Sequence, residues 1–206
     1  MKRIGVLVSG GGSNLQALID AIESGKLPAE IGVVISNKPE VFALERAARH
    51  QIPAMVIDHR SFASSLEFSK AILAELIASR VDLVCLAGFL RILDCCITKT
   101  FQNRMLNIHP SLLPAFGGKG MYGHHVHEAV IASGVKFSGA TVHLVTPETD
   151  VGPIVLQDIV KVTDTDTPES LAAKVLEIEH RIYPQAVQLF VEDQITIEGL
   201  RIKHKH

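Results

Sequence analysis

The chain has 206 residues, of which 47% are hydrophobic and 20% are charged, and its net charge is −2. This length and composition predict one globular domain with a core of ordinary size. The slightly negative balance lacks the basic surface that binds nucleic acid, and no apolar stretch is long enough to cross a membrane. We therefore expect small-molecule ligands, with neither a nucleic-acid nor a membrane partner.

The three cysteines do not suggest a disulfide scaffold. Cys95 and Cys96 are adjacent and Cys85 stands apart, so neither disulfide pairs nor a CxxC zinc motif is expected. Reduced thiols are typical of the cytoplasm. The first apolar run, residues 4–8, is too short for a signal peptide and leads into a glycine-rich loop. These features predict a cytoplasmic protein.

Predicted strands and helices alternate through the first half of the chain. Continuous apolar runs indicate buried strands, and apolar residues at helical spacing indicate the helices between them. The strands are expected at 4–8, 31–35, 54–57, 83–86 and 105–108, and the helices at 14–24, 41–50 and 66–79. This alternation predicts an α/β fold with a Rossmann-like, mostly parallel sheet flanked by helices.

The second half follows a different pattern. Residues 110–123, which contain several glycines and two prolines, predict a long loop, and a helix is expected at 125–133. Two strands at 141–145 and 154–160 are close in sequence and are expected to pair antiparallel. A long amphipathic helix is expected at 168–190, with Thr167 as its cap and Glu169 and Glu177 on its surface.

A glycine loop, Ser9-Gly10-Gly11-Gly12-Ser13-Asn14, joins the first strand to the first helix. Glycines let backbone N–H groups approach an anion closely, and the helix N-terminus adds partial positive charge. The loop lacks the GxxxxGK[ST] pattern of a P-loop, and Leu15 occupies the third glycine position of the dinucleotide fingerprint. The pattern favours a monophosphate, with a turn that binds no ligand as the alternative.

Residues 107–114, Asn-Ile-His-Pro-Ser-Leu-Leu-Pro, form the most distinctive segment. Asn107 and His109 are two residues apart on one side of a predicted strand, near its carboxyl end, where parallel sheets place ligands. Asp150 follows downstream. An amide can donate to an oxyanion, an imidazole can carry a proton near neutral pH, and a carboxylate can orient the imidazole. Together the three suit acyl transfer to an amine, although each alone could be a turn or core residue.

These segments resemble the phosphoribosylglycinamide formyltransferases of purine synthesis, a branch of the folate-dependent formyltransferase superfamily. The resemblance extends over roughly the first 190 residues. It rests on residues 12–15 (Gly-Ser-Asn-Leu), 86–93 (Leu-Ala-Gly-Phe-Leu-Arg-Ile-Leu), 107–114, 150–154 (Asp-Val-Gly-Pro-Ile) and 179–184 (Glu-His-Arg-Ile-Tyr-Pro). It implies the formyltransferase fold and transfer of a formyl group from 10-formyltetrahydrofolate to the amine of glycinamide ribonucleotide.

The resemblance also implies roles for individual residues. Three would be catalytic: Asn107, His109 and Asp150. Four would hold the phosphate and ribose of the acceptor: Gly12, Ser13, Asn14 and Glu179. Five would line the folate pocket: Leu90, Arg91, Ile92, Leu93 and Asn107. Asn107 and a protonated His109 would stabilise the oxyanion, while Asp150 would hold the imidazole and help to move the proton.

Further expectations concern the whole chain. Residues 1–206 would form one formyltransferase domain, with 1–109 as the phosphate- and nucleotide-binding half and 110–206 as the folate-binding and catalytic half. The folate would be a co-substrate, no metal would be needed, and the protein would be a monomer or homodimer. His124, His125 and His127 invite a metal site, but no third ligand stands at a fixed offset, so a histidine facing the acceptor phosphate is the favoured interpretation.

Two positions depart from the family pattern. The segment 115–123 is longer than in many relatives and is expected to alter the lid over the acceptor. Some relatives have an arginine for the glutamate tail of the folate where Ser65 stands here, with Arg60 a few residues earlier. Recognition of the folate tail therefore does not follow from the resemblance.

Three alternative functions share parts of this pattern. A formyltetrahydrofolate deformylase would use water as acceptor, but its relatives have an additional N-terminal domain, whereas the first strand here begins near Arg3. A methionyl-tRNA formyltransferase adds a C-terminal nucleic-acid-binding domain, and only 16 residues follow Phe190 here. A non-catalytic sensor on the same fold would bind both ligands and convert neither, because fold alone does not give function.

Overall fold

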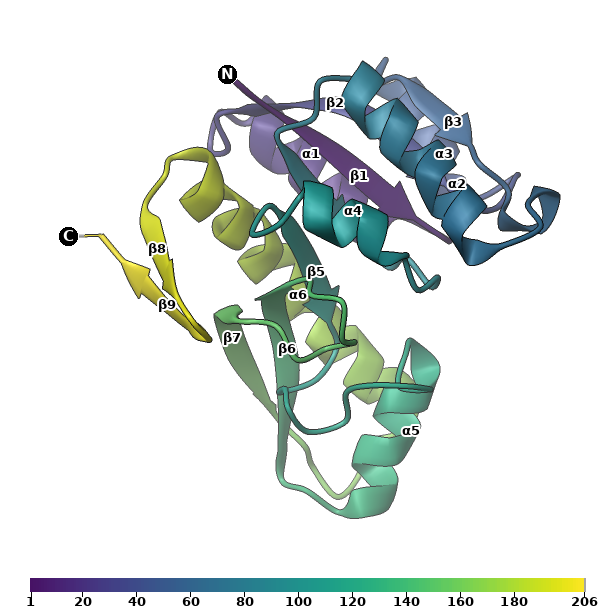
Figure 1. The fold of residues 1–206 in the computed structure, drawn as a ribbon. Helices are drawn as coiled ribbons and strands as arrows, with labels where there is room; N and C mark the ends of the chain where they lie inside the picture. Colours follow the sequence, from purple (N-terminus) through teal and green to yellow (C-terminus); the bar gives the residue numbers. More distant parts are fainter. Residues whose placement is uncertain (206) are drawn as a thin grey trace. The chain divides into compact units, whose positions relative to one another are not determined.

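The computed structural model describes residues 1–205 of the chain. Seven strands, numbered in chain order, form one sheet in the hydrogen-bonded order β3-β2-β1-β4-β5-β6-β7 (Figure 1). The chain divides into two compact units, with the boundary between Leu106 and Asn107 inside strand β5 (Met105–His109). The α/β fold predicted from the sequence is confirmed, with a mostly parallel sheet, flanking helices, an antiparallel strand pair and a long C-terminal helix.

The first unit contains alternating strands and helices. Its strands before β5 are β1 (Lys2–Val8), β2 (Ala29–Ser36), β3 (Ala54–Val56) and β4 (Leu83–Leu86). Its helices are α1 (Ser13–Glu23), α2 (Phe42–Arg49), the short 3-10 helix η1 (His59–Ser61), α3 (Ser65–Ala78) and α4 (Cys95–Thr100). Strand β1 lies between β2 and β4 and is parallel to both.

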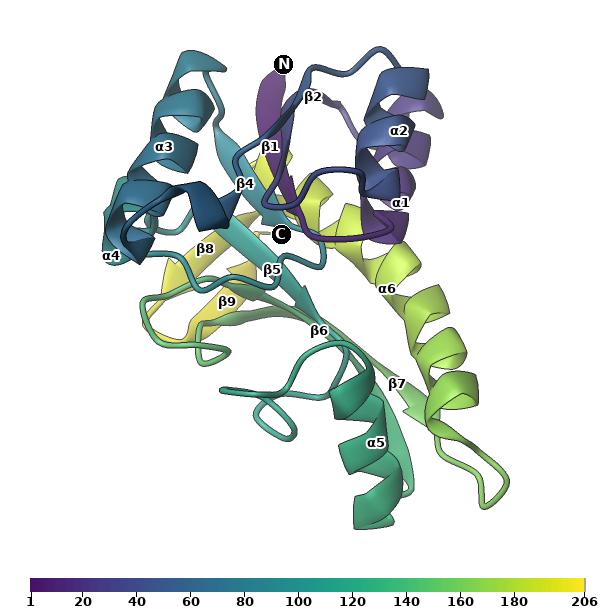
Figure 2. The ribbon, with the colours of Figure 1, turned by 90° about the vertical axis from the view of Figure 1, so that its right-hand side faces the viewer.

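Helices cover both faces of the strands of the first unit. Figure 2 shows α1 and α2 on one side of β1 and β4, and α3 and α4 on the other. A strand covered on both faces needs apolar side chains in both directions, and residues 4–8 of β1 are accordingly buried throughout. The carboxyl end of β1 leads directly into the glycine loop and so places that loop beside the start of α1.

The second unit continues from β5 with a different architecture. Its further elements are α5 (His124–Ser133), β6 (Phe137–Leu144), β7 (Ile154–Lys161), α6 (Pro168–Val191), β8 (Ile195–Glu198) and β9 (Arg201–His204). Strands β6 and β7 pair antiparallel, as expected, and α6 packs on both of them and on α5 (Figure 1). Thr167 caps α6, and its hydroxyl accepts a hydrogen bond from the Ser170 N–H at 3.2 Å.

Some short elements were not predicted from the sequence. Helix α4 has six residues, fewer than two turns, and its cysteines and threonines have weak helix propensity, so no periodic signal exists. Asp94 caps it by accepting a hydrogen bond from the Cys96 N–H at 3.0 Å. The prediction also ended at residue 190, whereas β8 and β9 form a hairpin in which Gly199 takes a φ of +59°.

No helix in the part of the chain that the structure describes combines the length and the apolar character required to cross a membrane.

Candidate active site

A buried polar cluster forms around the carboxyl end of β5. The three predicted catalytic residues, Asn107, His109 and Asp150, meet there with His143 of β6. His109 Nδ1 lies 3.7 Å from one carboxylate oxygen of Asp150, and His143 Nε2 lies 3.5 Å from the other. Asn107 Nδ2 lies 3.0 Å from His143 Nε2. Both histidines are at least 95% buried, so their interactions are little screened by water.

His143 also belongs to this cluster, although no role was predicted for it from the sequence. Its Nδ1 lies 2.9 Å from the Leu144 carbonyl, and because a carbonyl only accepts, Nδ1 carries a proton. Nε2 can then accept one of the two amide protons of Asn107, which leaves the other available to a ligand. A proton on Nε2 would instead face Asp150. The available signal was a histidine near the end of a strand that is buried from residue 138 onward.

Burial sets the protonation state of the cluster. Desolvation lowers the pKa of His109, and it outweighs the opposing effects of the Phe116 carbonyl and the Asp150 charge. Burial alone would raise the pKa of Asp150, but the contact with His143 and the hydrogen bond from the Gly118 N–H lower it, and so does any positive charge on the two neighbouring histidines. At neutral pH the cluster therefore combines an ionised carboxylate with an uncharged His109.

The middle of the long loop 110–123 holds this cluster in place. His109 Nε2 donates to the Phe116 carbonyl at 2.8 Å, and the Gly118 N–H donates to Asp150 at 2.9 Å. Phe116 and Asp150 have φ values of +53° and +58°, a left-handed conformation that is uncommon outside glycine. A Cβ on Gly117 would lie 2.5 Å from the end of the Leu113 side chain and 3.3 Å from the Asp150 Cβ, so a larger residue there would require Leu113 to move. Loop 115–123, considered only as a lid from the sequence, thus orients two of the predicted catalytic side chains.

The glycine loop in the first unit presents backbone groups rather than side chains. Gly12 has a φ of +70°, and a Cβ there would lie 2.6 Å from the Cβ of Ala43 in α2. Glycine is therefore required at this position. The N–H groups of Gly11, Gly12 and Ser13 donate to no acceptor among residues 1–205. Unpaired N–H groups before a helix suit an anion.

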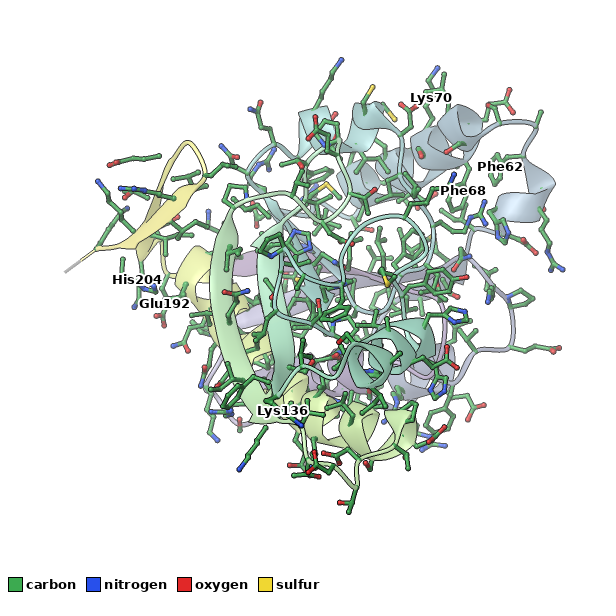
Figure 3. All side chains as sticks on the ribbon, turned by 90° about the horizontal axis from the view of Figure 1, so that it is seen from below. Phe62, Phe68, Lys70, Lys136, Glu192 and His204 are labelled. Atoms are coloured by element: carbon green, nitrogen blue, oxygen red, sulfur yellow. The ribbon has the colours of Figure 1, made fainter. Side chains whose placement is uncertain are left out.

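The segment after β4, which the resemblance assigns to the folate, is held at its ends and exposed in its middle. The Leu90 N–H donates to Ser9 Oγ at 2.8 Å, and the Asp94 N–H donates to Ser69 Oγ at 2.9 Å. Phe89 stacks on Phe68 of α3, with ring centroids 6.5 Å apart and an interplanar angle of 9°. Leu90 and Ile92 remain 47% and 68% exposed. Figure 3 labels Phe68 beside Phe62, the second aromatic ring packed against it.

Glu179 differs from the other carboxylates of α6. Glu169 and Glu177 are exposed, as predicted, whereas Glu179 is only 8% exposed. Acidic side chains are rarely buried to this extent unless they interact with a partner.

The three neighbouring histidines have different environments. His124 Nε2 lies 3.5 Å from Glu128 and 3.4 Å from Glu169, and His125 Nδ1 lies 3.1 Å from Glu128. His127 is buried, its Nδ1 has no hydrogen-bond partner in the described chain, and burial lowers its pKa. Among residues 1–205, no group of three or more histidine, cysteine or acidic side chains is arranged to hold a metal ion.

The sequence profile of the Formyl transferase family matches residues 2–187 of the chain. The protein therefore belongs to the Formyl transferase family, as its α/β fold and its amide–imidazole–carboxylate cluster had indicated.

Individual relatives make the similarity more specific. The chain is 42% identical over 198 residues to the phosphoribosylglycinamide formyltransferase of Haemophilus influenzae, covering 96% of this chain and 91% of that protein. It is 43% identical over 195 residues to the human trifunctional purine biosynthetic protein adenosine-3, covering 95% of this chain but 19% of that protein. The chain thus spans only about a fifth of the length of that larger relative.

A solved structure matches over the full chain. The crystal structure of glycinamide ribonucleotide transformylase 1 from Symbiobacterium toebii is 45% identical, with a TM-score of 0.96, and the match covers 100% of this chain and 95% of that one. A formyltetrahydrofolate deformylase from Pseudomonas syringae matches with a TM-score of 0.90 at 25% identity, covering 100% of this chain and 66% of that one.

Proposed function

We propose that the protein transfers the formyl group of 10-formyltetrahydrofolate to the amine of glycinamide ribonucleotide, giving formylglycinamide ribonucleotide in purine biosynthesis. The observation that carries this proposal is the buried contact of Asn107, His109 and Asp150 through His143, in a chain of the Formyl transferase family. The relative from Haemophilus influenzae, which this chain matches over almost its full length, supports the acceptor.

Each member of the cluster has a chemical role in the proposal. The acceptor amine attacks the formyl carbon, and the carbonyl oxygen becomes an oxyanion that the free N–H of Asn107 stabilises. The amine proton passes to the His109–Asp150 pair, since the lowered pKa leaves His109 able to accept it. The imidazolium then faces the oxyanion beside the ionised Asp150. The proton moves on to N10 of the folate as the carbon–nitrogen bond breaks and the formamide carbonyl re-forms.

The binding roles are part of the same proposal. Gly12, Ser13 and Asn14 hold the acceptor phosphate, which is supported by the unpaired N–H groups of Gly11, Gly12 and Ser13. The exposed apolar side chains of Leu90 and Ile92 support folate contact, which is extended to Arg91 and Leu93. The buried carboxylate of Glu179 is proposed to bind the ribose hydroxyls.

We also propose a domain organisation, an assembly state, a location and a class of ligands for the protein. The division of the domain into halves 1–109 and 110–206 stays a prediction, as does a monomeric or homodimeric state. Cytoplasmic localisation is supported by three cysteines that form no disulfide. Action on small molecules, without nucleic-acid or membrane partners, is supported by the names of the relatives and by the net charge of −2.

The test is an assay of the purified protein with 10-formyltetrahydrofolate, with and without glycinamide ribonucleotide. We expect loss of the formyl group only when the acceptor is present, with formylated ribonucleotide identified by mass spectrometry. Formate release without acceptor would replace the proposal with the deformylase activity named for the Pseudomonas syringae relative. Binding of both ligands without conversion would replace it with a sensor.

A further inference from the structure

The guanidinium of Arg46, in the last turn of α2, reaches back to the glycine loop. Its Nε donates to the Gly11 carbonyl at 2.9 Å, and its Nη1 donates to the Gln16 side chain of α1 at 3.0 Å. Its central carbon lies 4.6 Å above the ring of Phe42, in cation–π contact. One side chain thus joins the loop, the helix that follows it and the neighbouring helix.

The bond to Gly11 fixes the direction of an N–H group. A trans peptide holds a carbonyl and the following N–H in one plane and points them in opposite directions. The Gly11 carbonyl and the Gly12 N–H belong to the same peptide group. Because Arg46 holds that carbonyl, the Gly12 N–H is aimed away from the guanidinium.

The adjacent peptide groups are fixed in the same way. The Ala43 N–H of α2 donates to the Gly10 carbonyl at 3.2 Å, which aims the Gly11 N–H, and the Gln16 N–H donates to the Gly12 carbonyl at 2.9 Å, which aims the Ser13 N–H. They are the same three N–H groups, of Gly11, Gly12 and Ser13, that donate to no acceptor among residues 1–205. Arg46 is the one side chain that makes such a bond to these three carbonyls within residues 1–205.

We propose that Arg46 is a positioning residue that holds the glycine loop in its anion-binding conformation. The proposal rests on the function proposed above for this loop. A charge-assisted hydrogen bond to the carbonyl is stronger than a neutral one and suits a loop that must not relax.

Arg49 provides a matched control on the same helix. It lies 5.1 Å from the same Phe42 ring and pairs with Glu45 at 3.4 Å, and its side chain is 65% exposed. No hydrogen bond joins it to the glycine loop within residues 1–205. Arg49→Met therefore removes the same charge and a similar ring contact without touching the proposed clamp.

The first measurement compares the kinetics of Arg46→Met, Arg46→Lys and Arg49→Met. We expect Arg46→Met to raise KM for glycinamide ribonucleotide about 10- to 100-fold, with kcat and the folate KM within about threefold of wild type. Arg46→Lys should recover only part of the loss, because a single ammonium cannot reproduce the fork of the guanidinium. Arg49→Met should resemble wild type. Equal losses for both substrates, or the same loss in Arg49→Met, would overturn the proposal.

A binding measurement separates this proposal from the proposed reaction. Calorimetric titration with ribose 5-phosphate reports the anion affinity of the loop without turnover. Binding to wild type that is weakened about 10-fold or more in Arg46→Met supports the clamp, even if glycinamide ribonucleotide is not formylated. Equal binding to wild type and Arg46→Met, or no binding to wild type, would overturn it, even if the enzyme catalyses the proposed transfer.

Discussion

The glycine loop of the first unit and the cluster around Asp150 in the second are built from different parts of the chain. The loop presents backbone N–H groups whose direction is fixed by partners on the opposite side of each peptide. The cluster presents an amide, imidazoles and a carboxylate that fix one another through contacts of 3.0–3.7 Å.

This difference predicts different sensitivities to mutation. A site made of side chains should lose its chemistry when a single polar atom is replaced, even where shape is preserved. A site made of backbone should tolerate loss of exposed polar side chains and fail when an added Cβ or a lost support changes its conformation. Mutations in the loop should therefore raise KM for the acceptor, whereas mutations in the cluster should lower kcat.

Asp150→Asn should give the largest effect on turnover. Asparagine keeps the shape and tolerates the φ of +58°, but it removes the charge that faces His109 and His143. We expect kcat to fall about 10²- to 10⁴-fold, the usual range for loss of proton transfer, with KM for the acceptor nearly unchanged. Steady-state kinetics at saturating folate measures both. A kcat within threefold of wild type would remove Asp150 from the proton path.

Asn107→Ala tests the amide of the same cluster. Loss of one oxyanion donor costs about 10²- to 10³-fold in turnover, so kcat should fall by that factor while acceptor binding is retained. His143→Gln is the companion variant, because it loses the imidazole that accepts from Asn107 but leaves the amide present. It should lower kcat by less than Asn107→Ala does. A larger loss in His143→Gln would mean that the imidazole acts on the substrate directly.

The sequence contains signals for the candidate residues of both sites but few signals for the groups that support them. The motifs around Gly12 and Asn107 carry family patterns, and the strands that end beside them have strong apolar signals. Phe116 and Gly118 act through a backbone carbonyl and a backbone N–H, so their residue types do not reveal the contacts with His109 and Asp150. Arg46 contacts Gly11 across 35 positions of sequence, and only the packing of α2 against the loop brings them together. Supports of this kind are tertiary, so periodicity and propensity do not report them.

Gly12→Ala tests the backbone site. The methyl group would meet Ala43 at 2.6 Å and would sit at a φ of +70°, so the loop must shift. We expect KM for the acceptor to rise about 10-fold or more, with a loss of about 1–3 kcal/mol in unfolding free energy and a smaller change in kcat.

Gly10→Ala is the matched control for Gly12→Ala. A Cβ at Gly10 meets nothing within 4 Å, and its φ is not positive. This variant should bind the acceptor as wild type does. If Gly10→Ala and Gly12→Ala raise the KM equally, the loop requires flexibility at every glycine rather than a fixed conformation at Gly12.

The smallest expected effect is a change of unfolding free energy with pH. It arises in the second unit, where the buried histidines His109 and His127 lie. Burial lowers the pKa of His127 and of His109 below the ordinary value of 6.5. As pH falls below that value, these histidines bind protons in the unfolded chain but stay uncharged in the folded chain. The unfolding free energy therefore decreases until the pH reaches their folded-state pKa values. Urea unfolding at about pH 7.5 and pH 5.5 measures this decrease.

His127→Gln should make that decrease smaller, because it removes one of these two histidines and leaves His109 in place. The comparison is between the pH-dependent changes of each variant, so a uniform loss of stability from the substitution does not affect it. His125→Gln is the control, because its side chain is 60% exposed and on the same helix. An unchanged pH dependence in His127→Gln would show that burial does not keep this imidazole uncharged in the folded protein. An equal reduction in both variants would show that the burial of His127 is not the cause.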